Sequence, residues 1–196
     1  MQDNFDQLIS SYIDTQVGTT ENFLSPALSL ALTQHLDDLF TREKFHAAGT
    51  GKGTIAYDTS FRRDHIYWLD RAHENKSEDA FFDVMDAFVA HLNESCYTGI
   101  SSYEFHFARY DKDSFYKKHM DQFKSNEQRK YSIIIYLNVD WKTGDGGELC
   151  IYHEDRIQEI APLLGKTVMF KSCDLPHEVR LTHKPRLSIT GWLKSN

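Results

Sequence analysis

The sequence predicts a mostly β protein with supporting helices, an α+β fold in which the helices buttress a β-sandwich or barrel. Two helical patterns lie in the first half of the chain, and about six short strands divided by turn signals fill the second half. Helical segments between these strands are missing, which argues against a doubly wound parallel sheet. A length of 196 residues is enough for one domain with a substantial core.

The first helix is predicted over residues 25–48. Ser25 suits the N-cap position, and Pro26 suits the first helical position, where its missing N–H costs nothing. Five apolar residues then recur at helical spacing: Leu28, Leu32, Leu36, Leu39 and Phe40. Gly49 is expected to end the helix.

A second amphipathic helix is predicted from Glu78 onward. Between the two helices, the segment GTGKGTIAYDTSFRRDHIYWL mixes glycines with short apolar alternation, which predicts a loop and then a strand near Ile66–Leu69. The second helix places its apolar side chains on one face. These side chains are Phe81, Val84, Met85, Phe88, Val89 and Leu92.

The pattern changes to short strands after Gly99. The predicted strands are YEFHFARY, KYSIIIYLNV, GELCIYH, KTVMFKS, HEVRL and RLSITGWL. Turn signals such as KTGDGG and CDLP divide them. We therefore expect a single domain over residues 1–196, with a support layer of helices and strand in residues 1–98 and a β core that holds the functional site in residues 99–196.

The composition restricts the functional classes. Hydrophobic residues make up 40% and charged residues 26% of the chain, as in globular proteins. No apolar run approaches the roughly 18 residues of a membrane span, and the N-terminus lacks the basic and apolar parts of a secretion signal. We therefore expect a cytoplasmic protein without a membrane partner. The net charge of -7 argues against a general nucleic-acid-binding role, which needs clustered basic residues.

The three cysteines are Cys96, Cys150 and Cys173. They are odd in number, widely separated and without a CxxC pair, so the sequence suggests neither a disulfide framework nor a thiolate zinc site. We expect free thiols.

His119 and Asp121, in the segment YKKHMDQF, are candidate metal ligands. Side chains two residues apart on an extended strand project to the same face, while Met120 between them would point away. His177, at the start of a later strand, offers a third ligand, and two histidines with one carboxylate form the facial triad of non-haem Fe(II) oxygenases. The alternative is an exposed polar pair. Other histidines compete for the role of third ligand: His106, His153 and His183.

Arg186 is a candidate anchor for an anionic cosubstrate. Alternation along the last strand places Arg186 on one face with Ser188, Thr190 and Trp192, opposite the apolar residues. An arginine directed into a β core is costly unless it is paired, and its planar fork matches a carboxylate. We expect the distal carboxylate of 2-oxoglutarate as the partner. An internal salt bridge or an outward-facing charge is the alternative.

The order of these residues resembles the 2-oxoglutarate and Fe(II)-dependent dioxygenase superfamily: a His-x-Asp pair, a distant histidine, and an arginine and a tryptophan on the last strand. Within it, the sequence is most similar to the prolyl 4-hydroxylases of the oxygen-sensing type and their bacterial relatives. The segments that carry this resemblance are RRDHIYWL, IIIYLNVDW, GGELCIY and PHEVRL, and together they cover residues 50–196.

The resemblance implies a double-stranded β-helix (jelly-roll) core and a complete set of site residues. The iron ligands would be His119, Asp121 and His177, with no catalytic side chain beyond the metal centre. The cosubstrate-binding residues would be Arg186, Tyr136, Tyr110, Leu149, Val179 and Trp192, and Arg129 would lie near the substrate mouth. Without the resemblance, tyrosines and tryptophans in strands usually belong to the core. The implied cofactors are Fe(II), 2-oxoglutarate and O₂, with ascorbate as reductant.

The resemblance also implies the reaction. Oxidative decarboxylation of 2-oxoglutarate would be coupled to hydroxylation of a proline in a protein or peptide, by a chain for which a monomer is favoured. One alternative is the same chemistry on a free amino acid, a small metabolite or another residue type. Another is a non-catalytic β-barrel that binds metal or partner proteins. A zinc hydrolase is less favoured because the sequence lacks an HExxH motif and would leave Arg186 without a role.

Overall fold

A computed structural model describes residues 2–49, 58–122 and 128–195, and all structural statements concern this part of the chain. The helices are α1 (Gln2–Thr15), α2 (Pro26–Thr41), the short 3-10 helix η1 (Arg71–His73) and α3 (Lys76–Cys96). The strands are β1 (Val17–Thr20), β2 (His46–Ala47), β3 (Asp64–Trp68), β4 (Ser102–Tyr110), β5 (Tyr116–His119), β6 (Arg129–Tyr136), β7 (Leu149–Tyr152), β8 (Ile157–Ile160), β9 (Thr167–Lys171), β10 (His177–Val179) and β11 (Arg186–Lys194).

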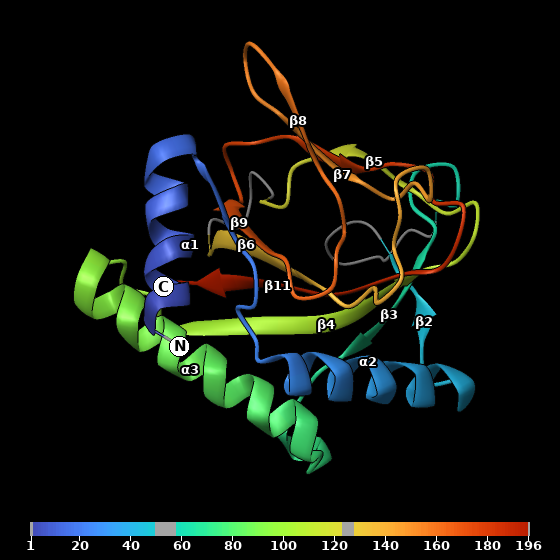
Figure 1. Ribbon diagram of the computed structural model, residues 1–196, viewed down its shortest axis with the longest axis horizontal. Coiled ribbons are helices and arrows are strands. Elements are labelled where there is room, and N and C mark those ends of the chain that lie inside the picture. The colour runs from blue at the N-terminus through green and yellow to red at the C-terminus, as the bar shows by residue number, and fades with distance from the viewer. Residues whose placement is uncertain (1, 50–57, 123–127, 196) are drawn as a thin grey trace.

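Two antiparallel sheets form the core. The main sheet has seven strands in the order β1-β9-β6-β11-β4-β3-β2, and the minor sheet has four in the order β5-β10-β7-β8. Figure 1 shows the minor sheet above the main sheet, with the helices along the far side of the main sheet. The predicted α+β class and the double-stranded β-helix core are therefore confirmed.

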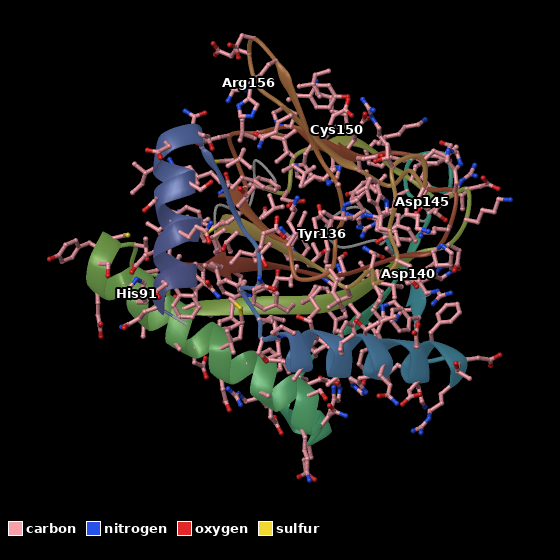
Figure 2. The ribbon with its side chains drawn as sticks, viewed as in Figure 1. His91, Tyr136, Asp140, Asp145, Cys150 and Arg156 are labelled. Carbon is pink, nitrogen blue, oxygen red and sulfur yellow. The ribbon has the colours of Figure 1, made fainter. Side chains whose placement is uncertain are left out.

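The main sheet separates two apolar layers because side chains alternate along its strands. On β6, Ile133 and Ile135 pack with the helices, whereas Ile134 and Tyr136 pack between the two sheets. Figure 2 shows Tyr136 in this inner space. Burial of each such side chain stabilises the fold by about 1.5–3 kcal/mol. The helical layer thus covers one face of the main sheet, and the inner face lies between the two sheets.

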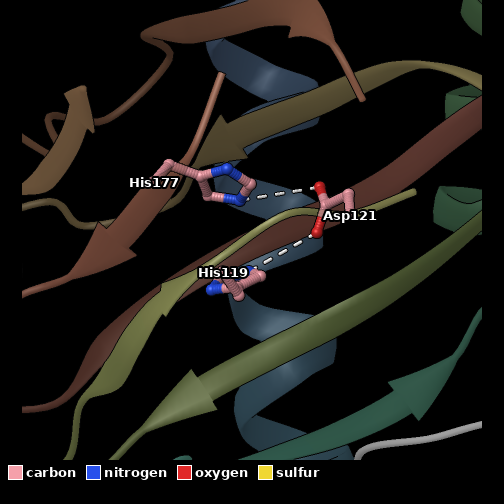
Figure 3. Close-up of side chains that lie close together, drawn as sticks. All are labelled: His119, Asp121 and His177. Atoms are coloured by element: carbon pink, nitrogen blue, oxygen red, sulfur yellow. Dashed lines mark ion pairs between the residues drawn. The ribbon is translucent and has the colours of Figure 1, made fainter. Parts of the chain in front are cut away.

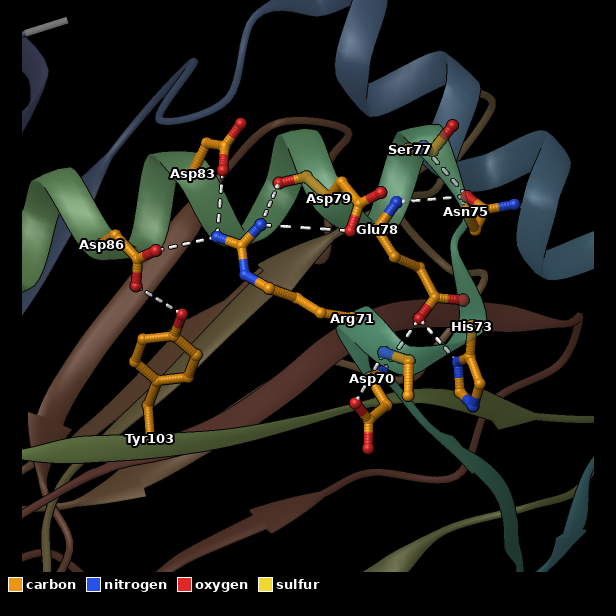
Figure 4. A network of polar contacts seen from close by, with 11 residues as sticks. Asp70, Arg71, His73, Asn75, Ser77, Glu78, Asp79, Asp83, Asp86 and Tyr103 are labelled. Atoms are coloured by element: carbon orange, nitrogen blue, oxygen red, sulfur yellow. Dashed lines mark hydrogen bonds and ion pairs between the residues drawn. The ribbon is translucent and has the colours of Figure 1, made fainter.

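Helix α3 confirms the second helical prediction. Asn75 caps its N-terminus, because the Asn75 side-chain oxygen accepts hydrogen bonds from the backbone N–H groups of Ser77 and Glu78. Tyr97 ends the helix in a left-handed conformation with φ 54°. Figure 4 shows the polar contacts around the first turns of α3. The buried residues of this helix are Glu78, Phe81, Phe82, Val84, Met85, Phe88 and Leu92.

Helix α2 is shorter than predicted. It begins at Pro26, with Ser25 as N-cap, but it ends at Thr41 rather than at residue 48. The N–H of Lys44 bonds to the carbonyl of Leu39, and Glu43 has φ 56°, as in a Schellman motif. The prediction failed because the apolar helical spacing stops at Phe40, after which β2 adds an edge strand to the main sheet.

The first half of the chain contributes more strand than the sequence indicated. Strands β1, β2 and β3 all pair within the main sheet, and β3 begins two residues before the predicted Ile66–Leu69 segment. Helix α1, which buries Phe5, Leu8 and Ile9, was not predicted. The division at residues 98 and 99 stays a prediction. Residues 50–57 of the predicted glycine-containing loop lie outside the described residues.

The described helices include none that is both long and apolar enough to cross a membrane. The described cysteines are all free thiols, as expected, and Cys150 is buried.

Candidate active site

A cavity of about 260 Å³ lies between the two sheets. The inner faces of β3, β4 and β11 form one wall, and β5, β7 and β10 contribute residues from the minor sheet. Nine of the ten predicted site residues line it: His119, Asp121, His177, Arg186, Tyr110, Leu149, Val179, Trp192 and Arg129. Tyr136 lies behind this lining, fully buried beside Arg186.

The three candidate metal ligands converge at one side of the cavity. Strands β5 and β10 pair so that His119 lies opposite His177. The Nε2 atom of His119 is 3.5 Å from one oxygen of Asp121, and Nε2 of His177 is 3.6 Å from the other. Figure 3 shows both imidazoles directed toward this carboxylate. One ligand atom from each residue lies within 4.8 Å of the others, close enough for a single ion.

Asp121 reaches this position in a different way from the one predicted. Strand β5 ends at His119, so Asp121 stands in a bend beyond the strand rather than on its face. Met120, expected to point away, lines the same cavity. The departure from extended backbone after His119 explains both differences, because strict alternation holds only within the strand.

Backbone carbonyls fix the tautomer of both histidines. The Nδ1–H group of His119 donates to the carbonyl of Lys117 at 2.7 Å, and that of His177 donates to the carbonyl of Leu175 at 3.1 Å. A carbonyl can only accept, so each Nδ1 carries a proton and Nε2 is the ring nitrogen left to bind a metal. Metal-ligating histidines are oriented in the same way.

The carboxylate of Asp121 is held by a hydroxyl chain. Ser132 Oγ donates to Asp121 at 2.6 Å and lies 2.9 Å from Ser172 Oγ. Burial acts to raise the pKa of Asp121, but His177, His119 and Ser132 together hold that pKa well below its usual range. Burial lowers the pKa of His177, opposed by Asp121. Two imidazole nitrogens with an ionised carboxylate form a donor set that suits Fe(II).

Arg186 is buried at the opposite side of the cavity, with 2% of its surface exposed. Its Nε donates to the Gly147 carbonyl at 2.8 Å, and Nη1 lies 3.4 Å from Ser188 Oγ. Nη2 has no hydrogen-bond partner, and no carboxylate of the described residues forms an ion pair with this guanidinium. The internal salt bridge considered as an alternative is therefore absent from this part of the chain.

Two tyrosine rings and the backbone of Gly147 pack against Arg186. The guanidinium carbon lies 4.9 Å from the ring centre of Tyr110 and 5.0 Å from that of Tyr136. Burial raises the pKa of both tyrosines, and the Tyr136 hydroxyl, like Nη2, is buried without a partner. Gly147 has φ 78°, and a Cβ there would approach Arg186 Cδ to 2.9 Å. Only glycine permits this close packing.

The unpartnered atoms of Arg186 and Tyr136 form a site for an anion. An unsatisfied buried donor costs about 1–3 kcal/mol, more for a charged group. A carboxylate ligand would satisfy the guanidinium Nη2 and the tyrosine hydroxyl together. The geometry therefore fits the carboxylate predicted from sequence.

Arg129 and Trp192 lie together at the same wall. The guanidinium carbon of Arg129 is 3.5 Å from the ring centre of Trp192, and Arg129 Nη2 is 2.8 Å from Glu104. Arg129 is thus already paired, in contrast to Arg186. Its predicted role near the substrate stays a prediction.

Two further features of the cavity were not assigned from sequence. Arg62 and the buried Asp64 form a bidentate pair with distances of 2.6 and 2.7 Å. Arg62 also stacks over Tyr116, with its guanidinium carbon 4.4 Å from the ring centre. The second feature is His106 on β4, which also lines the cavity. The sequence could have identified it, because alternation along a strand places His106 on the same face as Tyr110.

Comparisons with known proteins agree with this geometry. The family model described as the 2OG-Fe(II) oxygenase superfamily matches residues 105–194. The prolyl 3,4-dihydroxylase OGFOD1 of Ostreococcus tauri is 38% identical in an alignment 80 residues long, which covers 33% of this chain and 16% of that protein. The chain thus corresponds to a small part of this curated relative.

Solved structures resemble the whole chain. A prolyl-4-hydroxylase of Pseudomonas putida superposes with a TM-score of 0.88 at 27% identity, over 98% of this chain and 99% of that one. A Trichoplax adhaerens prolyl hydroxylase, in complex with a hypoxia-inducible factor peptide fragment, gives 0.89 at 21% identity, over 99% and 91%. At the latter identity the likeness shows the fold alone.

A double-stranded β-helix with two imidazoles and a carboxylate around one centre defines the class of facial-triad, non-haem iron proteins. The chain resembles the 2OG-Fe(II) oxygenase superfamily over residues 105–194, and its resemblance to the prolyl hydroxylase type is confirmed.

Proposed function

We propose that the protein is an Fe(II)- and 2-oxoglutarate-dependent dioxygenase that hydroxylates a proline in a protein or peptide to 4-hydroxyproline. The observation that carries the proposal is the presence, in one cavity, of the His119–Asp121–His177 cluster and of a buried arginine without a carboxylate partner. The similarity to the Pseudomonas putida prolyl-4-hydroxylase over nearly the full chain supports the prolyl substrate.

His119, Asp121 and His177 would each bind the metal through one atom, and each is oriented by a hydrogen bond. His119 and His177 supply Nε2 lone pairs, fixed in direction by their Nδ1–H bonds to the backbone. Asp121 supplies a carboxylate oxygen and keeps its orientation through Ser132. Fe(II) bound here would supply the oxidative chemistry with 2-oxoglutarate and O₂, because three protein ligands leave coordination positions open.

The opposite side of the cavity would bind and orient the cosubstrate. Arg186 would grip the distal carboxylate of 2-oxoglutarate, and Tyr136 would donate its hydroxyl to the same group. Leu149 and Val179 would form apolar walls that exclude water, while Tyr110 and Trp192 would confine the cosubstrate laterally. A dry cavity strengthens each polar contact inside it.

The remaining predictions accompany this proposal. Ascorbate as reductant, a cytoplasmic location, a monomeric state and the absence of nucleic-acid and membrane partners all stay predictions. Arg129, stacked on Trp192, is proposed to contact the substrate at the mouth of the cavity.

The test combines two measurements on one incubation. The protein is supplied with Fe(II), 2-oxoglutarate and O₂ together with a panel of synthetic peptides, each with a single proline. Succinate release is quantified, and mass spectrometry locates any added oxygen. We expect one oxygen on proline for each succinate formed. Succinate without modified proline would contradict the prolyl substrate, and metal and 2-oxoglutarate binding without succinate would indicate a non-catalytic binding protein.

A further inference from the structure

His106 lines the cavity but belongs to neither of the two clusters described above. It lies on β4, and strand pairing places Thr190 on one side of it and Trp68 on the other. All three residues line the cavity. The His106 ring contacts two tryptophans, with centre-to-centre distances of 4.9 Å to Trp68 and 5.5 Å to Trp192.

The polar atoms at this wall lack partners. His106 is 2% exposed, and its Nδ1 has no hydrogen-bond partner among the described residues. The indole Nε1 of the adjacent Trp192 is also buried without a partner. The hydroxyl of Thr190 lies 3.3 Å from Ser188 Oγ and is hydrogen-bonded to neither of these nitrogens. Two residues that line the cavity therefore each have a ring nitrogen without a hydrogen-bond partner among the described residues.

His106 is neutral in this setting. Burial, and next the nearby Arg62 guanidinium, lower its pKa to about 3, while Asp64 and Asp121 oppose the shift and Arg129 adds to it. A neutral imidazole has one N–H donor and one acceptor, so it can serve as a specific hydrogen-bond donor.

The chemistry of the neighbouring indole restricts the ligand. Trp192 Nε1 can only donate, so its partner must be an acceptor. Peptidyl proline has no backbone N–H and offers only carbonyl oxygens near its ring. A substrate of this kind satisfies buried donors and leaves none of its own groups unpaired, and it requires the His106 tautomer with the proton on Nδ1.

We propose that His106 is a substrate-binding residue whose neutral imidazole donates from Nδ1 to a backbone carbonyl oxygen next to the target proline, beside the Trp192 donor. The proposal rests on the proposed function. It assigns the wall around His106 and Trp192 to binding of the substrate backbone. It distinguishes His106 from Arg186 and Tyr136, whose unpartnered atoms serve the cosubstrate.

The experiment uses the full chain loaded with Mn(II) and 2-oxoglutarate, so that binding is measured without turnover. The probe is the single-proline peptide that the wild type hydroxylates fastest in the panel described above. Calorimetry gives the peptide Kd for the wild type and for His106→Phe, His106→Asn and His106→Gln. The amide nitrogen of Asn can take the place of Nδ1, whereas that of Gln takes the place of Nε2.

Thr167→Val is the matched control. Thr167 is also buried with an unpartnered hydroxyl, but it does not line the cavity. The control therefore removes an unsatisfied polar atom without touching the proposed subsite. Its peptide Kd should equal that of the wild type.

We expect His106→Phe to weaken peptide binding about ten-fold, the effect of one lost hydrogen bond, with an unchanged Kd for 2-oxoglutarate. His106→Asn should recover most of the affinity, and His106→Gln should not. Unchanged peptide binding in His106→Phe, or recovery by Gln alone, would overturn the Nδ1 assignment while the proposed function stands. A wild type that hydroxylates no prolyl peptide would overturn both. Equal melting temperatures of the Phe and Asn variants exclude a folding defect as the cause of the difference.

Discussion

Arg186 and Glu78 are both charged side chains with almost no exposed surface, but their surroundings differ in kind. Glu78, at the start of α3, accepts from His35 Nε2 at 2.8 Å, from His73 Nδ1 at 2.9 Å and from the Asp70 N–H at 3.0 Å. Figure 4 shows the Asp70 and His73 contacts. Arg186 has one strong bond to a backbone carbonyl and an unpartnered Nη2.

The difference separates a structural charge from a binding charge. Burial acts to raise the pKa of Glu78, but the donors on α2 and η1 outweigh it and hold that pKa below its usual value. The Glu78 network thereby joins three helices behind the main sheet. Arg186, on the cavity side of the same sheet, keeps hydrogen-bonding capacity that no described residue uses. The chain itself supplies hydrogen-bond donors to the Glu78 carboxylate, whereas the Arg186 guanidinium keeps one nitrogen without an acceptor.

The largest expected effect concerns the metal ligands. Replacement of His119 or His177 by Ala should abolish 2-oxoglutarate-dependent succinate release, because two remaining ligands hold Fe(II) poorly. Metal analysis of the purified variants should show iron well below one atom per chain. The control is His153→Ala, which removes a histidine bonded to Gln158 outside the cavity. Full iron content and turnover in His119→Ala would refute the ligand assignment.

The second prediction concerns replacement of the binding charge, Arg186. Arg186→Met should raise the KM for 2-oxoglutarate by about 100-fold, since charge-assisted hydrogen bonds contribute roughly 1.5–3 kcal/mol each. The unfolding free energy of the ligand-free protein should stay equal or increase, because an unsatisfied buried charge is removed. Arg186→Lys keeps the charge but loses the planar guanidinium, so its KM for 2-oxoglutarate should lie between those of the wild type and Arg186→Met. Chemical denaturation and steady-state kinetics test both parts, and an unfolding free energy lower by several kcal/mol would mean that Arg186 is structural.

Glu78→Gln should give the reverse result. One amide oxygen cannot accept from three donors, so the unfolding free energy should fall by about 2 kcal/mol. The KM for 2-oxoglutarate should remain unchanged. Asp83→Asn is the control in the same region, since Asp83 pairs with Arg71 but is 73% exposed, and its loss should cost under about 0.5 kcal/mol. A changed KM in Glu78→Gln would show that the helical layer influences the cavity.

The last prediction concerns the pH dependence of stability, at a third buried titratable side chain. The pKa of His106 lies at about 3 in the folded protein, below the ordinary value of about 6.5 in the unfolded chain. Between these values only the unfolded state binds the proton, so stability is lost as pH falls through this window, by up to about 1.4 kcal/mol per pH unit. Denaturation of the ligand-free protein between pH 4 and 6.5 should show a shallower dependence for His106→Asn. Parallel curves would place a charged or solvated imidazole at this position.

The sequence predicted the site best where a strand pattern fixed the direction of side chains. Alternation along β11 correctly placed Arg186 and Trp192 on the cavity face, opposite Leu187 and Ile189. The pairing of β5 with β10, which brings His177 to His119, joins segments far apart in the chain. Local patterns do not carry that information, and the family resemblance supplied it.

The failures have local physical causes. The end of α2 depends on a left-handed Glu43, a residue type that does not mark helix ends as glycine does. Met120 faces the cavity because the backbone bends after β5. His106 went unassigned because a histidine in an apolar strand is more often a core residue, and only the tertiary arrangement shows that its partner atoms are missing.

The most direct test is a crystal structure of the protein with Mn(II) and 2-oxoglutarate. We predict one ion bound by His119 Nε2, His177 Nε2 and an Asp121 oxygen, and the distal carboxylate of 2-oxoglutarate against Arg186 and the Tyr136 hydroxyl. An ion bound elsewhere, or a cosubstrate whose carboxylate leaves Arg186 without a partner, would contradict the account.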